Sequence, residues 1–137
     1  MLVDSRSTNC FISEHLAAAA FRKMPLQQPV TVRVANGDML LCTHELPDQL
    51  WCIQGVTFKT SFKILPLNCY DMILGMDWLV GNSPMEIHWA EKWFQFSNNG
   101  RTVKIFGLQT EAVMGPLLLC ISYLPWRNMI QYCTMFS

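Results

Sequence analysis

A single aspartate near the start of the chain has the clearest chemical meaning in this sequence. Asp4 follows the apolar residues Leu2 and Val3, and Ser5 comes directly after it. An aspartate on a tight loop can form half of a carboxylate pair, about 3 Å apart, whose shared proton lets the pair activate water and protonate an amide. The serine can hydrogen-bond across to a second loop. Asp4 and Ser5 are therefore candidate catalytic residues.

The residue after Ser5 departs from what such a loop requires. A glycine is expected there, because the missing side chain lets substrate approach the backbone, but the sequence has Arg6. A chain with one such motif must take its second aspartate from a partner, which implies a two-fold homodimer with an isologous interface. The alternative is that Asp4 and Ser5 only cap a turn or helix, which both residue types often do.

The composition is that of one ordinary domain without an electrostatic preference. The chain has 137 residues, of which 51% are hydrophobic and 15% are charged, and 10 basic side chains balance 10 acidic ones. Such a chain can bury a core of its own. Its neutral charge gives no argument for binding nucleic acid or an anionic membrane.

The cysteines and histidines indicate neither a metal nor a cofactor. The 6 cysteines form no C-x-x-C pair, and no histidine pair has zinc-finger spacing. The N-terminus has no signal-peptide pattern, so we expect reduced, mostly buried cysteines in an intracellular, cytoplasmic chain. The best candidate for a membrane span, residues 112–126, is too short and holds Pro116 and Pro125, so we expect no transmembrane segment.

The periodicity predicts strands and turns with one or two short helices. Asn36-Gly37, between residues 30–35 and 38–43, predicts a hairpin with a type I′ turn. Ser13 is a candidate N-cap for a helix over residues 14–23. Further strands are predicted over residues 50–53, 56–64, 70–74, 86–89, 93–97 and 102–106, and a short helix over 76–80.

These elements describe an all-β barrel or sandwich. We assign residues 1–109 to this domain. Residues 110–137 are apolar without a strict period, and we treat them as a tail of unknown role.

Four segments of the chain, in order, resemble a known family. They are Leu2-Val3-Asp4-Ser5-x-Ser7-Thr8-x-x-Phe11-Ile12-Ser13, Val34-Ala35-Asn36-Gly37-Asp38-Met39-Leu40-Leu41-Cys42, Phe62-Lys63-Ile64-Leu65-Pro66-Leu67 and Tyr70-Asp71-Met72-Ile73-Leu74-Gly75-Met76-Asp77-Trp78-Leu79. They resemble the active-site segment, the flap hairpin and the second half of the retropepsin-like aspartic peptidases of gypsy-type LTR retrotransposons, most closely those of plants.

The resemblance implies a fold, a site and a substrate. The fold would be the retropepsin half-barrel, closed by homodimerisation, with one catalytic Asp4 from each chain and Ser5 hydrogen-bonding across the two loops. Arg6, Ser7 and Thr8 would complete the active-site loop, and Ile73, Leu74 and Gly75 would pack beside it. The flap residues Ala35, Asn36, Gly37 and Asp38 would fold over an extended peptide from the element's own polyprotein.

Two departures from this family bear on activity. Arg6 places a side chain where backbone should meet substrate, and it would strain the loop by about 1–2 kcal/mol if the position needs a positive φ. Two guanidiniums beside the carboxylate pair would also favour ionisation of both aspartates and remove the shared proton. Only three residues precede Asp4, whereas the family has a further strand upstream, so we expect an N-terminally truncated domain with an unpaired sheet edge.

The remaining candidates have simpler interpretations. Neither Asp71 nor Asp77 precedes Ser/Thr-Gly, so we interpret both as structural caps. We expect local hydrogen bonds for His15, His44 and His88, and core or dimer-facing places for Trp51, Trp78, Trp89 and Trp93. Cys10 has no histidine or asparagine pattern around it, which disfavours a cysteine peptidase.

Three functions stay open from the sequence. The first is an aspartic endopeptidase impaired by Arg6. The second is a non-catalytic relic or pseudoenzyme that keeps the fold and dimerises or binds peptides. The third is a membrane-surface or partner-binding protein that uses the apolar tail.

Overall fold

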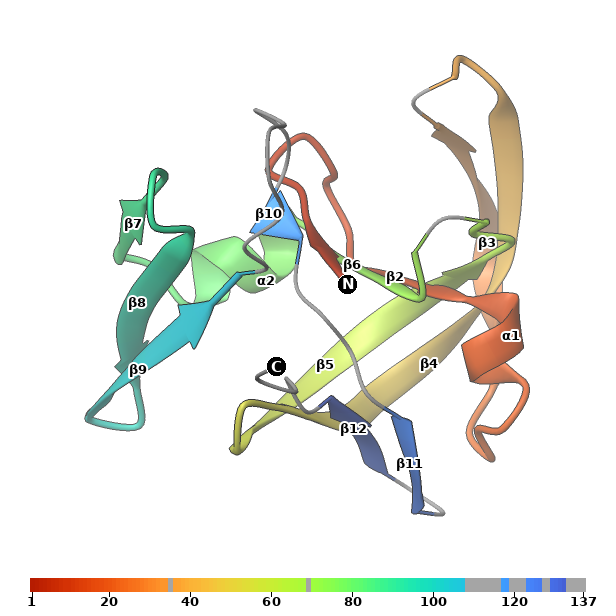
Figure 1. The fold of residues 1–137 in the computed structure, drawn as a ribbon. Helices are drawn as coiled ribbons and strands as arrows, with labels where there is room; N and C mark the ends of the chain where they lie inside the picture. The colour runs from red at the N-terminus through yellow and green to blue at the C-terminus, as the bar shows by residue number, and fades with distance from the viewer. Residues whose placement is uncertain (35, 69, 108–116, 119–122, 127–128, 133–137) are drawn as a thin grey trace.

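The computed structural model describes residues 1–34, 36–68, 70–107, 117–118, 123–126 and 129–132, and within these it is all-β with two short helices, as predicted (Figure 1). The strands are β1 (Leu2–Val3), β2 (Phe11–Ser13), β3 (Met24–Arg33), β4 (Met39–Ile53), β5 (Val56–Leu65), β6 (Met72–Leu74), β7 (Met85–His88), β8 (Trp93–Asn98), β9 (Arg101–Phe106), β10 (Leu117–Leu118), β11 (Tyr123–Trp126) and β12 (Met129–Tyr132). The helices are α1 (Glu14–Ala17) and α2 (Met76–Gly81).

Most of the strands form one sheet, and its centre positions the candidate site. The order is β10-β1-β6-β2-β5-β4-β12-β11, with β3 paired to β4, while β7, β8 and β9 form a separate antiparallel sheet. β6 lies between β1, to which it is parallel, and β2, to which it is antiparallel. The chain between β1 and β2 must therefore pass over the end of β6.

The long hairpin of β3 and β4 is confirmed, but its predicted type I′ turn is wrong. The backbone N–H of Val34 donates to the carbonyl of Asp38 (2.9 Å), so the hydrogen bond nearest the turn encloses three residues, 35–37, and not two. Gly37, at φ 92°, is the last of these three, as in hairpins whose turn ends in a left-handed glycine. The paired positive φ values of a type I′ turn occur instead at Gln54-Gly55 (47° and 79°) and Asn99-Gly100 (52° and 76°).

The first helix and the first long strand also differ from their predicted bounds. Ser13 is the N-cap, since its side chain accepts a hydrogen bond from the N–H of Leu16, but α1 ends at Ala17 instead of continuing to residue 23. The chain beyond it offers no buried face, because Phe21 is 78% exposed, and short helices depend on tertiary packing. β3 includes Pro25, which this strand tolerates because it pairs only with β4.

The predicted strands 38–43 and 50–53 are parts of one strand, β4. The connecting residues follow the polar pattern of a loop, but β4 continues through them with a register irregularity between Leu46 and Gln49. Asp48, at φ 49°, lies within this irregularity. A bulge of this kind bends a strand without ending it, and the residue pattern alone did not indicate it.

An aromatic cluster beneath α2 holds the two sheets together. Trp78 of α2 packs edge-to-face on Phe58 and Phe96, with ring centroids 5.5 Å apart in each case. Trp51 stacks on Phe58 at 4.9 Å. The expectation of a core role for the tryptophans is confirmed for Trp51, Trp78 and Trp93, which are 0%, 6% and 9% exposed. It is wrong for Trp89 as a core residue, because its side chain is 71% exposed.

The tail stays largely outside the described residues. The unpaired sheet edge that we expected beside the Asp4 motif is wrong, because β1 pairs with β6 on one side and with β10 on the other. β12 pairs with β4 and β11, and the boundary between 1–109 and 110–137 stays a prediction. Neither helix of the described chain has the length and apolar character needed to cross a membrane.

Replacing Trp78 should test whether the aromatic cluster carries the stability of the fold. We expect Trp78→Ala to lower the free energy of unfolding by about 3–5 kcal/mol, because it removes a large side chain from a packed core. The control Trp89→Ala should change it by less than about 0.5 kcal/mol. Urea denaturation followed by circular dichroism measures both, and equal effects would contradict the packing described here.

Candidate active site

The loop that carries Asp4 is anchored by backbone contacts to the end of β6 and the start of α2. The N–H of Asp4 donates to the carbonyl of Leu74 (3.0 Å). The N–H groups of Met76 and Asp77 donate to the carbonyls of Ser7 (2.7 Å) and Thr8 (3.3 Å). These bonds tie both halves of the predicted motif together, so the structure brings the Asp4 loop and Ile73-Leu74-Gly75 into one site.

Gly75 is where the loop comes closest to its support. A Cβ atom built on Gly75 would lie 2.3 Å from the carbonyl oxygen of Asn9 and 2.7 Å from that of Ser7. Its φ of −102° is one that any residue can adopt. Glycine is therefore required here by the close approach of the backbone and not by an unusual conformation.

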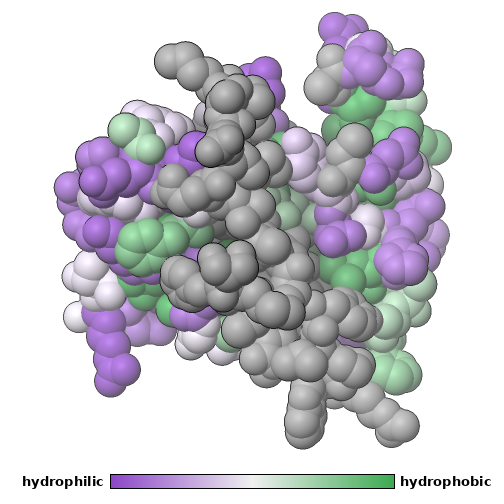
Figure 2. Space-filling model, viewed as in Figure 1, coloured by the Kyte–Doolittle hydropathy of each residue, from purple (hydrophilic) through white to green (hydrophobic). Residues whose placement is uncertain are grey.

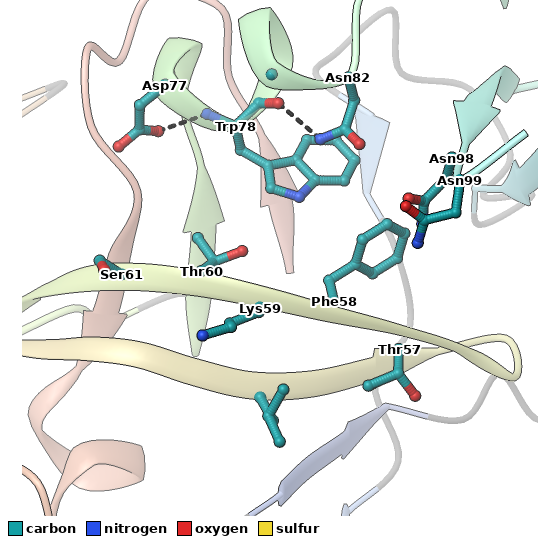
Figure 3. Close-up of a pocket in the computed structure, with 12 residues that line it drawn as sticks. Thr57, Phe58, Lys59, Thr60, Ser61, Asp77, Trp78, Asn82, Asn98 and Asn99 are labelled. Atoms are coloured by element: carbon teal, nitrogen blue, oxygen red, sulfur yellow. Dashed lines mark hydrogen bonds between the residues drawn. The ribbon is translucent and has the colours of Figure 1, made fainter.

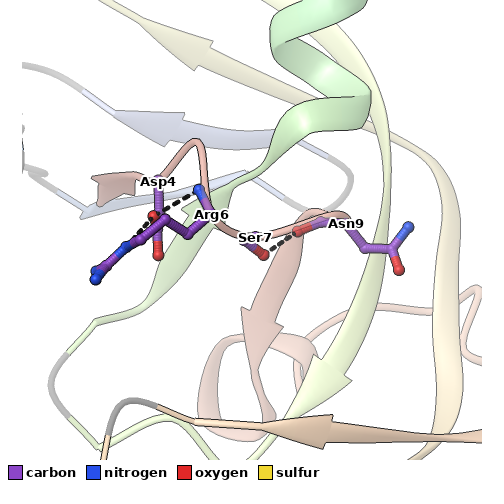
Figure 4. A network of polar contacts seen from close by, with 4 residues as sticks. All are labelled: Asp4, Arg6, Ser7 and Asn9. Atoms are coloured by element: carbon purple, nitrogen blue, oxygen red, sulfur yellow. Dashed lines mark hydrogen bonds and ion pairs between the residues drawn. The ribbon is translucent and has the colours of Figure 1, made fainter.

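Arg6 folds back onto Asp4 (Figure 4). The backbone N–H of Arg6 donates to Oδ1 of Asp4 (3.0 Å), and the guanidinium Nε lies 3.3 Å from the same oxygen. The side chain of Arg6 is 82% exposed, whereas that of Asp4 is 22% exposed. The candidate catalytic carboxylate thus already has a cationic partner.

The backbone strain considered for Arg6 is not observed. The non-glycine residues with positive φ in the described chain are Asp48, Gln54, Lys92 and Asn99, and Arg6 is not among them. Two of the expected effects of Arg6 on the site therefore remain: the bulk of its side chain and its charge.

The other loop residues have separate places. Ser7 donates its hydroxyl hydrogen to the carbonyl of Asn9 (2.7 Å) and so stiffens the loop from within. Ser5 and Thr8 are exposed. No hydrogen bond of the Ser5 hydroxyl occurs within the described residues, and its predicted partner lies on a second chain, so that role stays a prediction.

The predicted flap residues lie at the tip of the β3–β4 hairpin. Asn36 and Asp38 are exposed and joined to each other, with Nδ2 of Asn36 donating to Oδ2 of Asp38 (2.7 Å) and the N–H of Asp38 donating to Oδ1 of Asn36 (2.9 Å). Ala35 lies outside the described residues. Figure 2 shows hydrophilic side chains gathered at this tip, and Figure 1 shows the tip and the Asp4 loop both at the top of the view.

The structure does not join the flap to the Asp4 loop in the single chain. Among the described residues, no hydrogen bond links residues 36–38 to residues 4–10. Any closure of the flap over a substrate therefore stays a prediction.

The sequence did not identify a contact between the buried thiol of Cys10 and the exposed carboxylate of Asp77. The prediction that Asp77 caps α2 is wrong, because Gly75 occupies the N-cap position. Its Oδ2 accepts the backbone N–H of Cys10 (3.1 Å), and its Oδ1 accepts the Cys10 thiol (2.8 Å). The Sγ of Cys10 in turn accepts the N–H of Gly75 (3.3 Å). The pair closes the end of the Asp4 loop onto α2.

Burial and the Asp77 carboxylate together act on the Cys10 thiol. Burial first, and then the hydrogen bond with Asp77, raise the pKa of Cys10 to about 12. The thiol is therefore protonated at neutral pH, which makes it a hydrogen-bond donor and not a nucleophile. Only the position of Asp77, two residues after Gly75 in the second-half motif, could have indicated this contact from sequence.

The remaining candidates carry no further chemistry. Within the part of the chain that the structure describes, no three histidine, cysteine, aspartate or glutamate side chains are grouped as metal ligands. His44 contacts the hydroxyl of Thr43 (2.8 Å), and His88 accepts the N–H of Glu91 (3.0 Å), as local roles predict. Asp71 uses its backbone carbonyl, which accepts the N–H of Ser13 (2.8 Å).

The family follows from the segment that contains this site. The family model of the PEG10/RTL1 protease domain matches residues 1–103, which include the Asp4 loop, the hairpin and Gly75. The chain belongs to the PEG10/RTL1 protease domain family. This family is retropepsin-like and derived from retroelements, in agreement with the all-β fold. No curated protein and no solved structure matches the chain.

The steric requirement at Gly75 can be tested against a second glycine of the same helix. Gly75→Ala should lower the free energy of unfolding by about 1–3 kcal/mol or more, because the new methyl group overlaps the loop backbone. Gly81→Ala should leave stability unchanged or raise it by up to about 1 kcal/mol, since a Cβ there meets nothing within 4 Å. Urea unfolding measures both, and equal effects of the two changes would refute the close contact.

The raised pKa of Cys10 predicts a specific loss of stability in alkali. The folded chain holds the thiol proton up to about pH 12, whereas a free thiol loses it near the ordinary value of 9.0. The contribution of the protonated Cys10 thiol to the free energy of unfolding is fully present below about pH 9 and is lost as the pH rises toward 12. Between pH 8 and 10.5 we expect the parent to lose about 1–2 kcal/mol more than Cys10→Ala. Parallel pH profiles of the unfolding free energy would contradict this assignment.

Proposed function

We propose that this chain is an aspartic-type endopeptidase domain of a retroelement polyprotein, active as a homodimer and impaired by Arg6. The observation that carries the proposal is the place of Asp4. It stands on a loop braced against the second-half motif, in a chain that belongs to a retropepsin-like protease family. In this reading each chain supplies one Asp4, and the two share a proton to activate water.

A second chain is needed because neither of the other aspartates in the second-half motif can serve as the second catalytic carboxylate. Asp77, the nearest candidate in the motif, already binds Cys10 with both carboxylate oxygens. Asp71 is exposed, and its backbone carbonyl accepts the N–H of Ser13 at the end of β2. A partner's Asp4, brought in by a two-fold axis, is the simplest source of the second carboxylate.

The finer roles of the site residues belong to the same proposal. Ser5 hydrogen-bonds across to the partner's loop, and Ser7 and Thr8 shape the loop floor. The hairpin tip at residues 35–38 covers an extended peptide of the element's own polyprotein and pairs with it strand to strand. A gypsy-type, plant-like element is the proposed source, and the free buried cysteines Cys10, Cys42 and Cys52 are consistent with an intracellular site.

Arg6 acts against this chemistry through its charge. The guanidinium Nε lies 3.3 Å from Oδ1 of Asp4, an oxygen that the catalytic pair needs for its water and shared proton. In a dimer two such cations would face the two aspartates and would compete with water and substrate for these oxygens.

A second candidate function rests on the same ion pair. If the Asp4–Arg6 contact persists in the dimer, the chain is a pseudoenzyme that keeps the fold and binds peptides or its own copy without cleaving them. The third function, membrane or partner binding through residues 110–137, concerns a segment that lies mostly outside the described residues and stays a prediction.

Cleavage of a peptide library between about pH 4 and 7 tests the proposal. We expect little activity in the parent and at least tenfold more in Arg6→Gly, about 1.4 kcal/mol of transition-state stabilisation. The backbone N–H to Asp4 survives this change. Arg6→Gln, which keeps bulk without charge, should recover activity partly. Asp4→Asn, combined with Arg6→Gly, is the control and must be inactive.

Each outcome decides between the candidates. Full parent activity that Asp4→Asn abolishes would refute the inhibitory role of Arg6. Activity in Arg6→Gly but not in Arg6→Gln would assign the impairment to side-chain bulk. If no variant cleaves any peptide, although analytical ultracentrifugation shows folded dimers, the peptidase is rejected and the non-catalytic dimer is favoured.

A further inference from the structure

The peptide unit between Leu74 and Gly75, here called the bridging peptide, is hydrogen-bonded on both sides by the Asp4 loop. Its carbonyl oxygen accepts the N–H of Asp4 at the start of the loop (3.0 Å). Its N–H, which belongs to Gly75, donates to Sγ of Cys10 at the end of the loop (3.3 Å). Because the C=O and N–H of a trans peptide point in opposite directions within one plane, a tilt of this plane moves both contacts together.

Cys10 is a fixed point for the bridging peptide. Its side chain is fully buried, its carbonyl accepts the N–H of Lys63 in β5 (3.0 Å), and its N–H donates to Oδ2 of Asp77 (3.1 Å). The thiol keeps its proton at neutral pH, because burial and the Asp77 contact raise the pKa of Cys10 to about 12. That proton is directed at Oδ1 of Asp77 (2.8 Å), which leaves the sulfur as an acceptor for the N–H of Gly75.

Asp77 is held in turn by the first turn of α2. Its Oδ1 also accepts the N–H of Trp78 (2.7 Å), as Figure 3 shows, and the indole of Trp78 is buried in the aromatic cluster. The N–H of Asp77 donates to the carbonyl of Thr8 (3.3 Å). A series of contacts therefore runs from the core through Asp77 and Cys10 to the bridging peptide, and it ends at the N–H of Asp4.

We propose that Cys10 and Asp77 are positioning residues of the peptidase, which fix the backbone of Asp4, and with it the direction of the carboxylate, through the bridging peptide. This role rests on the proposed function, in which Asp4 is a catalytic residue. Among the described residues, every hydrogen bond in which a side chain joins residues 4–10 to the second-half motif involves Cys10. Since a misplacement of about 1 Å can cost about a hundredfold in rate, these two residues would matter to the reaction without touching substrate.

The first measurement needs no peptidase activity. Amide hydrogen exchange of the full chain, followed by NMR, reports on the bond between the N–H of Asp4 and β6. We expect Cys10→Ala to speed exchange of the Asp4 amide about tenfold or more relative to the amides of β8, which record global opening. Cys10→Ser keeps a donor and an acceptor and should restore most of this protection. The control Cys52→Ala, a second buried cysteine on β4, should affect the Asp4 amide no more than those of β8.

A double-mutant cycle tests whether Asp77 acts through Cys10. Asp77→Asn keeps the shape of an exposed side chain but offers one acceptor oxygen in place of two, so one of its bonds to Cys10 is lost whichever way the amide points. We expect it to speed exchange of the Asp4 amide, and we expect the double variant with Cys10→Ala to exchange no faster than the more affected single variant. Independent effects that multiply in the double variant would overturn the proposed series of contacts.

The second measurement is peptide cleavage by chains that also carry Arg6→Gly. We expect Cys10→Ala and Asp77→Asn to lower kcat about tenfold or more and to leave KM within about twofold, because the carboxylate is displaced while the surface that binds substrate is kept. Cys10→Ser should recover most of kcat, and Cys52→Ala should keep it. Circular dichroism gives the folded fraction of each variant. A kcat per folded chain that does not change would show a structural role alone and overturn the proposal.

The two measurements separate this inference from the proposed function. Faster exchange of the Asp4 amide in Cys10→Ala, with no cleavage by Arg6→Gly, would support the link from Cys10 to Asp4 and reject the peptidase. Cleavage by Arg6→Gly, with neither kcat nor exchange changed by Cys10→Ala, would support the peptidase and overturn the positioning role. In an active chain, a change in only one of the two readouts would also overturn it. Unchanged exchange in a chain without activity would overturn both.

Discussion

The candidate site depends on the close approach between Gly75 and the loop from β1 to β2. The carbonyl oxygens of Ser7 and Asn9 occupy the space in which any larger residue would place its Cβ. This approach lets the N–H groups of Met76 and Asp77 reach the loop carbonyls. The backbone of Asp4 is thus positioned by packing on β6 and α2, while side-chain contacts of Ser7 and Cys10 brace the same loop.

Arg6 shows how a change in such a loop can be tolerated by the fold and still alter the chemistry. Its backbone adopts no left-handed conformation, and its N–H makes the same bond to Asp4 that a glycine could make. The exposed guanidinium contributes little to stability, since solvent screens a surface ion pair. Its consequence lies in the contact with Oδ1 of Asp4, an oxygen on which a shared-proton mechanism depends.

The short helix α2 connects the Asp4 loop to the core between the two sheets. Its first residues hold the Asp4 loop, through Met76 and through the Cys10–Asp77 pair. Its last residues border a hollow that residues 57–61 of β5 also line (Figure 3). Between them Trp78 packs into the aromatic cluster that joins the two sheets.

The sequence by itself determined the features that are encoded locally: the period-2 strands β5, β8 and β9, the Ser13 cap, the Asn36-Gly37 hairpin and the motif around Asp4. Turn chemistry, capping and alternation are written in neighbouring residues, which is why these predictions could be made. The tertiary structure alone decided the length of α1, the continuity of β4 and the partner of Asp77. Each of these depends on which distant segment packs alongside, and no local pattern contains that information.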